Sequence, residues 1–118
     1  MLTENKLFSY KIKEDALEIK LVGEIDHHNA VNVRSDIDSL IFETRPKKLI
    51  LDLSEISFMD SSGLGLIMGR YSLIRDLGGG LSLRAPTVAV MKILALAGME
   101  RMIKIEKAGW EENKNEEK

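Results

Sequence analysis

The chain has 118 residues, of which 44% are hydrophobic and 31% are charged, and its net charge is −2. This length suits one domain with one core, and the interspersed charges give no basic surface for direct binding of nucleic acid. The absence of cysteine excludes disulfides, thiolate metal sites and a cysteine nucleophile. No apolar run resembles a signal peptide or spans a bilayer, so we expect a cytoplasmic protein without membrane contact.

The first third of the chain predicts a β-hairpin followed by a helix. Residues 7–13 and 16–23 alternate apolar and polar side chains, which indicates two antiparallel strands sharing one apolar face. A helix is expected over residues 29–42, with Asp26 as its cap and with its end before Pro46. Its inner stripe is expected to comprise Val31, Val33, Ile37, Leu40 and Ile41.

The remainder predicts strands in alternation with helices. The strand patterns cover residues 48–53, 81–84 and 102–105, and the helical patterns cover residues 62–77 and 86–97. This alternation indicates an α/β fold, with a mostly parallel sheet, an N-terminal antiparallel hairpin and helices after the parallel strands. We expect one domain over residues 1–106, followed by a polar C-terminal tail over residues 107–118.

The ends of the two later helices carry the expected signals. Gly78 and Gly98 follow the two helical patterns, and Pro86 suits the first turn of the second one. Residues 88–97 are apolar on more than one helical face, which suggests either that Val90 and Ile93 are left exposed for a partner or that this helix is buried more deeply than usual.

The junction between the strand at 48–53 and the next helix has an unusual composition. Asp60 and Ser61 suit an N-cap, but a cap needs only one side chain. Gly63 and Gly65 follow within the first turn, where each costs about 1 kcal/mol relative to alanine. This cost suggests that something approaches the backbone closely at this point.

Three turns are expected to share one edge of the sheet. Asp26 follows one strand, Asp60 and Ser61 follow the second, and residues 84–87 follow the third. Turns after parallel strands gather along the edge where α/β proteins usually bind their ligands. We therefore expect all three turns on one rim.

Enzymatic chemistry has little support at this rim. A small serine hydrolase would use Ser61 or Ser62 with His27 or His28 as the base, but the Gly-x-Ser-x-Gly turn is missing. This class of enzyme remains an alternative, because geometry alone does not exclude it. We otherwise expect no enzyme and no catalytic residue.

Metal and nucleotide sites are poorly supported as well. Asp26 and Asp60 are suitable ligand types for a metal, but no diagnostic metal spacing is present. Gly63 and Gly65 resemble the start of a dinucleotide fingerprint, but its last glycine position is Met68 and Asp60 would repel phosphate. We expect no metal and no cofactor.

A phosphorylated serine would suit this turn as a switch. Phosphate adds about −1.5 to −2 charges, and a helix N-terminus tolerates a negative charge. Beside Asp60 and Asp26 the added charge would repel an acidic partner docked on the rim. The residues themselves leave open whether Ser61 or Ser62 is the acceptor.

Two segments form a recognisable pattern, namely Gly23-Glu24-Ile25-Asp26-His27-His28 and Phe58-Met59-Asp60-Ser61-Ser62-Gly63-Leu64-Gly65-Leu66-Ile67-Met68-Gly69-Arg70-Tyr71. Together they closely resemble the STAS family of anti-sigma factor antagonists, and most of all its sporulation members. The resemblance implies a non-enzymatic antagonist that binds an anti-sigma factor serine kinase, frees the sigma factor and is switched off by phosphorylation of Ser61. It also implies a phosphatase that restores Ser61, and weak nucleotide binding. A stress or other sigma-factor pathway is the alternative setting.

The expected switch and partner-binding residues lie at the rim or on the helix that starts there. They are Asp26, Asp60, Ser61, Ser62, Gly63, Gly65 and Arg70.

Overall fold

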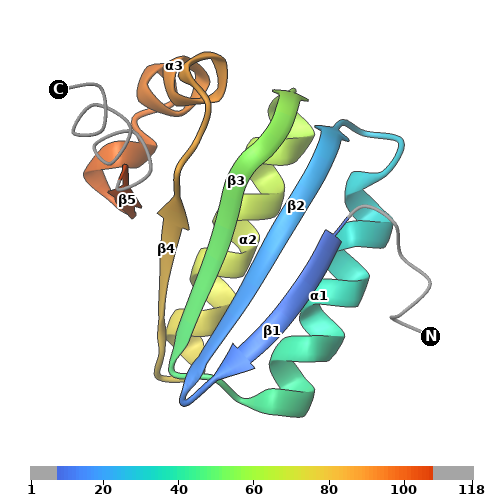
Figure 1. Ribbon diagram of the computed structural model, residues 1–118, viewed down its shortest axis with the longest axis vertical. Coiled ribbons are helices and arrows are strands. Elements are labelled where there is room, and N and C mark those ends of the chain that lie inside the picture. The colour runs from blue at the N-terminus through green and yellow to red at the C-terminus, as the bar shows by residue number, and fades with distance from the viewer. Residues whose placement is uncertain (1–7, 108–118) are drawn as a thin grey trace, which may run out of the picture.

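The computed structural model describes residues 8–107 as a five-stranded sheet with helices (Figure 1). Strand order follows chain order, and only the first pair of strands is antiparallel. This confirms the expected α/β fold with its N-terminal hairpin. The strands are β1 (Phe8–Lys13), β2 (Ala16–Ile25), β3 (Lys48–Met59), β4 (Gly80–Arg84) and β5 (Lys104–Glu106), and the helices are α1 (Ala30–Thr44), α2 (Ser61–Asp76), α3 (Val88–Leu96) and the 3-10 turn η2 (Met99–Arg101).

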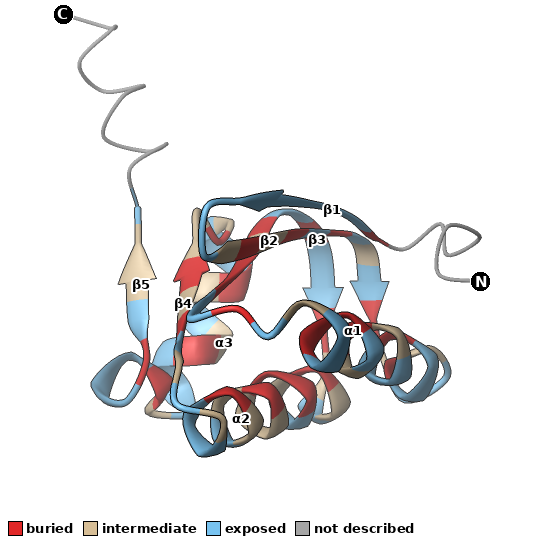
Figure 2. Cartoon of the chain, turned by 90° about the horizontal axis from the view of Figure 1, so that it is seen from below, coloured by how far each residue is buried: buried red, intermediate tan, exposed pale blue. Residues whose placement is uncertain are grey.

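The core lies between the sheet and the two longer helices. Helices α1 and α2 run side by side under one face of the sheet, and their buried sides face the strands (Figure 2). Leucine or isoleucine occupies every second position from Leu17 to Leu21 of β2 and from Leu49 to Leu53 of β3, so alternate side chains of these segments enter this layer. Side chains with no more than 1% exposure include Leu17, Ile19, Leu21, Leu49, Leu51, Leu53, Ile37, Ile41, Ile67 and Ile74.

Strand β3 is much longer than expected, and this moves the third turn away from the rim. The pairing of β3 with β4 ends where Asp52 meets Arg84, whereas β3 continues to Met59 beside β2. Seven residues of strand span roughly 23 Å, so the turn after Arg84 begins far behind Asp60. The expectation that three turns share one rim therefore holds only for the turns after β2 and β3. Helix α3 then packs beside the projecting part of β3 (Figure 1).

The phases of α1 and α3 differ in part from the predicted ones. Val31 is exposed rather than in the inner stripe of α1, because it lies on the side away from the sheet. Val90 is fully buried and Ile93 packs against the core, whereas Val88 and Leu96 are exposed. The prediction that Val90 and Ile93 are left over is therefore wrong.

Most helix ends follow the predicted signals. Gly78 and Gly98 have positive φ angles after α2 and α3, and Arg45, directly before the proline, takes a left-handed conformation that ends α1. Helix α3 begins later than expected, because the hydroxyl of Thr87 accepts the hydrogen bond of the Val90 backbone N–H. The proline at 86 thus precedes the helix instead of lying in its first turn. The predicted tail lies outside the described residues from 108 onward.

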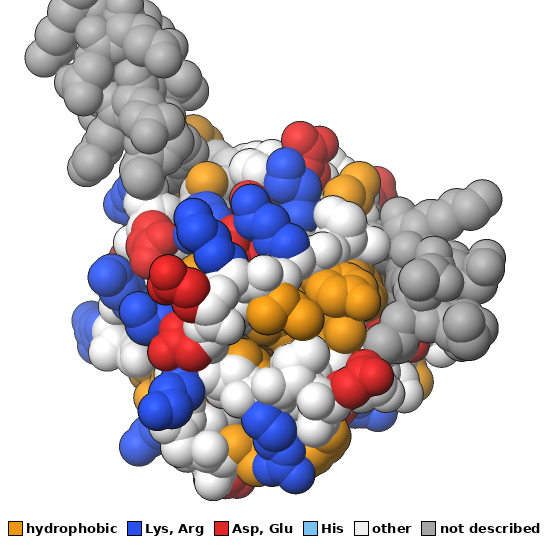
Figure 3. Space-filling view, turned by 60° about the horizontal axis from the view of Figure 1, so that its bottom comes forward, with side chains coloured by type: hydrophobic (Ala, Val, Ile, Leu, Met, Phe, Trp, Pro, Cys, Tyr) orange, Lys and Arg blue, Asp and Glu red, His pale blue; other side chains and the backbone are white. Residues whose placement is uncertain are grey.

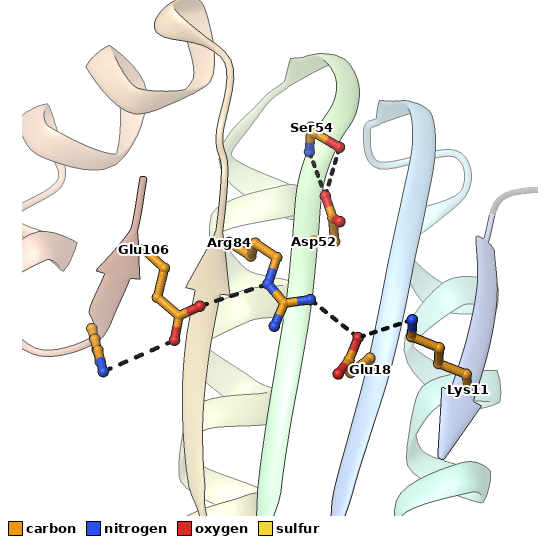
Figure 4. Close-up of polar contacts among 7 residues, drawn as sticks. Lys11, Glu18, Asp52, Ser54, Arg84 and Glu106 are labelled. Atoms are coloured by element: carbon orange, nitrogen blue, oxygen red, sulfur yellow. Dashed lines mark hydrogen bonds and ion pairs between the residues drawn. The ribbon is translucent and has the colours of Figure 1, made fainter. Parts of the chain in front are cut away.

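The other face of the sheet carries a ladder of alternating charges (Figure 4). Arg84 pairs with Glu18 at 3.1 Å and with Glu106 at 3.6 Å, and Lys11 lies 3.8 Å from Glu18. Burial lowers the pKa of Arg84, but its hydrogen bond to Glu18 and the surrounding carboxylates together raise this pKa above its ordinary value. The ladder spans the strands and surrounds a hollow of about 290 Å³. Of the residues that line this hollow, Lys11, Glu18 and Arg84 pair with one another in the ladder.

The surface elsewhere mixes charged side chains with a few apolar ones. Figure 3 shows a hydrophobic patch bordered by acidic and basic side chains on the face that it presents. Exposed large apolar residues include Tyr10 and Ile12 of β1, which pair with buried residues of β2. The predicted apolar face of the hairpin is therefore fully buried on β2, but on β1 only Phe8 is buried. In the described part of the chain no helix is long and apolar enough to cross a membrane.

Candidate functional site

The turn after β2 is held by Asp26. Its Oδ1 accepts hydrogen bonds from the backbone N–H of His28 at 2.9 Å and of Asn29 at 3.3 Å. Asn29 returns a bond, because its Oδ1 accepts the backbone N–H of Asp26 at 3.0 Å, and its side-chain amide donates to the carbonyl of Glu24. Asp26 therefore fixes the turn before α1 and does not cap the helix itself, whose N-cap position is Asn29.

The turn after β3 is shorter and runs directly into α2. Asp60 is the N-cap, and its Oδ1 accepts the backbone N–H of Ser62 at 2.8 Å. Ser61 is the first helical residue and is exposed, whereas Ser62 is half-buried. The two serines that the sequence could not separate thus have different surroundings. Of the two, Ser61 is the more exposed to solvent.

The two turns are neighbours in the fold. Ile25 and Met59 are paired in the sheet, so Asp26 and Asp60 each follow one member of this pair. The backbone N–H of Asp60 donates to the carbonyl of Ile25 at 3.2 Å. This contact joins the ends of β2 and β3, and it brings both aspartates and Ser61 to one small rim, as predicted.

The two glycines of the first turn of α2 have different reasons to be there. A Cβ on Gly63 would lie 2.8 Å from the Cβ of Met59, so the close approach at this position is made by the chain itself. A Cβ on Gly65 would meet nothing within 4 Å. Gly65 is exposed, and no packing within the described chain requires it.

Arg70 is placed away from the rim surface. Its side chain is only 7% exposed, and its Nε lies 2.9 Å from Oδ1 of Asp38 in α1. The two groups are not aligned for a hydrogen bond. Among the described residues, Oδ1 of Asp38 and the Nε and Nη1 atoms of Arg70 therefore have no hydrogen-bond partner. Burial raises the pKa of Asp38, although the positive charges of Arg70 and Arg34 act to lower it. Burial also lowers the pKa of Arg70, although the negative charge of Asp38 acts to raise it.

A groove lies beside Ser62, between the first turns of α1 and α2. Its volume is about 360 Å³. Ala30, Val31 and Leu66 line it with apolar atoms, and Val31 is 56% exposed. Its remaining lining residues are His27, Arg34, Ser62 and Gly65. The sequence gives no signal for Val31 or Arg34 in this role, because the side of α1 that lines the groove depends on where α2 lies.

The geometry of a hydrolase or a metal centre is not seen in residues 8–107. The rings of His27 and His28 stack on each other with centroids 4.2 Å apart, and neither is hydrogen-bonded to Ser61 or Ser62. Asp60, which directly precedes Ser61, caps the helix. In the described residues no group of three metal-ligating side chains comes together.

Comparison with known proteins identifies the family. The STAS domain profile matches residues 8–108, which is most of the chain and includes the rim and both helices beside it. The chain belongs to the STAS domain family.

Similar STAS proteins are named as regulators. The chain is 37% identical over 89 residues to an anti-sigma F factor antagonist of Paenibacillus polymyxa, covering 75% of this chain and 76% of that protein. It is 26% identical over 95 residues to an anti-sigma-B factor antagonist of Bacillus subtilis, covering 80% and 85%. This STAS domain is thus of the anti-sigma factor antagonist type, which is a regulatory class.

A solved structure of such a regulator has the same fold. The unphosphorylated anti-sigma factor antagonist SpoIIAA superposes with a TM-score of 0.73 at 30% identity, covering 83% of this chain and 86% of that one. The phosphorylated form of the Bacillus protein SpoIIAA gives a TM-score of 0.66 at 29% identity, with coverage of 83% and 89%. The identity in both cases goes beyond a likeness of fold alone.

Proposed function

We propose that this STAS domain is an anti-sigma factor antagonist switched by phosphorylation of Ser61. Unphosphorylated, it binds an anti-sigma factor that is also a serine kinase, and the sigma factor is released. Phosphorylated, it dissociates from the kinase until a phosphatase removes the phosphate. The single observation that carries this proposal is the exposed Ser61 at the start of α2, directly after the capping Asp60.

The surroundings of Ser61 suit a reversible charge. A phosphate there lies at a helix N-terminus, where negative charge is stabilised by about 0.3–1 kcal/mol, so the domain stays folded. Asp60 and Asp26 already make the rim acidic, and phosphorylation adds about −1.5 to −2 charges beside them. A carboxylate of the partner that is tolerated before phosphorylation is then repelled. The switch therefore acts on binding and needs no rearrangement of the core.

The other site residues have supporting roles in this proposal. Asp26 and Asp60 set the shape and charge of the rim, Ser62 fixes the first turn through its backbone N–H, and Gly63 lets that turn pack on Met59. Arg70 is buried and reaches Asp38 of α1. Its proposed role is therefore to position α2 relative to α1, and not to contact the partner at the surface.

The test is phosphorylation and binding with the anti-sigma kinase of the same genome. Wild type should gain one phosphoryl group by intact mass with ATP, and Ser61→Ala should gain none and stay bound to the kinase. Ser61→Asp should bind weakly, and Ser62→Ala should still gain one phosphoryl group. Ser72→Ala, at an exposed serine further along α2, is the control for binding and should behave like wild type. If Ser61→Ala is still phosphorylated, or Ser61→Asp binds like wild type, the switch does not lie at Ser61.

The sigma factor is proposed to be the sporulation factor sigma-F, in the cytoplasm. The similarity to an anti-sigma F factor antagonist supports this, and the similarity to an anti-sigma-B factor antagonist supports the stress pathway as the alternative. Binding measured against both types of kinase distinguishes them, because the cognate kinase should bind at least about tenfold more tightly. Weak nucleotide binding stays a prediction, which titration with ATP and GTP tests. Labelling with a fluorophosphonate would instead support a serine hydrolase.

A further inference from the structure

We propose that the groove between α1 and α2 receives an acidic and apolar segment of the kinase, whose carboxylate pairs with Arg34. This inference rests on the proposed function and specifies how the partner is recognised. The groove is lined by Ser62, next to the phosphorylation site, and by residues of both helices.

The first observation is the vacant space at Gly65. A glycine inside a helix costs about 1 kcal/mol relative to alanine, and at Gly63 the chain itself requires this because Met59 lies against it. At Gly65 the chain offers no such reason, since a Cβ there would be free of contacts within 4 Å. Gly65 lines the groove, so its missing side chain keeps the groove open. An occupant from outside the chain would explain the cost.

The second observation is the chemistry of the groove wall. Ala30, Val31 and Leu66 provide an apolar floor, and Val31 is left largely exposed on a helix whose other valine, Val33, is fully buried. Arg34 stands at the same wall and forms no ion pair within 4.0 Å in the described part of the chain. A segment that combines an apolar side chain with a carboxylate matches both features.

The groove also explains how phosphorylation releases the partner. Arg34 favours a carboxylate in the groove, while phosphate on Ser61 places negative charge one residue from Ser62 at its wall. The phosphate then opposes the same carboxylate that Arg34 attracts. Docking and release thus act on one charged group of the partner.

The experiment measures binding of the anti-sigma kinase to variants of the full chain. Gly65→Met fills the groove and should weaken binding about tenfold or more, as expected for loss of a central contact. Because the space at Gly65 is open and glycine is a poor helix former, this variant should unfold at the same temperature as wild type or higher. Ser72→Met is the control, since it adds an exposed apolar side chain to the same helix seven residues, or about two turns, further along.

Charge is tested separately. Arg34→Ala should weaken binding about fivefold or more and reduce its dependence on salt concentration, which a merely structural defect would leave unchanged. Lys48→Glu is a more severe change of charge at the opposite end of β3, and it should bind like wild type. If wild type binds and Gly65→Met binds equally well, or Arg34→Ala keeps the affinity and salt dependence of wild type, the groove proposal is wrong. If wild type does not bind the kinase at all, the proposed function fails and the groove proposal fails with it.

Discussion

The ion pair between Asp38 and Arg70 is predicted to lower the stability of the fold. We expect the double variant Asp38→Leu and Arg70→Met to be more stable than wild type by about 2 kcal/mol, because pairing returns less than burial of both charges costs. Leucine and methionine retain apolar contacts in the layer between α1 and α2, and they bring in no charge.

The magnitude follows from exposure and hydrogen bonding. Arg70 is 7% exposed and Asp38 29% exposed, so the guanidinium loses most of its water and the carboxylate loses less. Three of their buried polar atoms have no aligned hydrogen bond among the described residues. Each such atom costs about 1–3 kcal/mol, against which the attraction at 2.9 Å and the residual hydration of Asp38 must be set. A net gain of about 2 kcal/mol corresponds to a rise in Tm of roughly 6–12 °C for a chain of this size.

Urea unfolding followed by circular dichroism measures this change. Both single variants complete a double-mutant cycle, which gives the coupling energy of the pair. Arg75→Met on the exposed side of α2 is the control and should change the free energy of unfolding by no more than about 0.5 kcal/mol. A double variant less stable than wild type by 1 kcal/mol or more, taken here as about half the predicted gain, would refute the reasoning, because pairing would then outweigh burial.

Three further predictions concern the same region. Burial raises the pKa of Asp38 above its ordinary value of 3.8, so the charged carboxylate costs stability at neutral pH, and this cost is relieved as the pH falls. Asp38→Asn should therefore be more stable than wild type at pH 7. Urea titrations should show that this advantage shrinks toward about pH 4. Asp60→Ala should lose about 1 kcal/mol through the lost cap, whereas Asp60→Asn should lose less; equal losses would mean that capping is unimportant. Gly63→Ala should lose about 1–3 kcal/mol against Met59, and Gly65→Ala should gain up to about 1 kcal/mol; thermal unfolding in the reverse order would contradict the assigned packing.

Local patterns predicted the elements well where each pattern has one physical cause. Alternation gave the hairpin, and glycine gave the ends of α2 and α3, since only glycine takes positive φ without strain. The sequence predicts strand β3 only to residue 53, because Ser54, Glu55 and Ser57 interrupt its apolar run. The second half of β3 pairs with β2 alone and leaves much of its surface in water, so the hydrophobic signal is weak.

The site was predicted in part for a comparable reason. Asp26, Asp60 and Ser61 follow strands, and topology alone brings such positions together. The partner of Arg70 could not be predicted, because Asp38 lies on another helix and no spacing connects them. The groove depends in the same way on the rotation of α1 relative to α2, which places Val31 and Arg34 beside Gly65.

The charge ladder on the uncovered face of the sheet has a consequence for the behaviour of the protein at high concentration. Sheets with apolar faces stack about 10 Å apart, and a bare sheet would offer such a face to other copies. Here the positive charges of Lys11 and Arg84 balance the negative charges of Glu18 and Glu106, so the face keeps its water. Among residues 8–107, the face that carries the ladder can therefore stay in contact with water and still resist stacking on other copies.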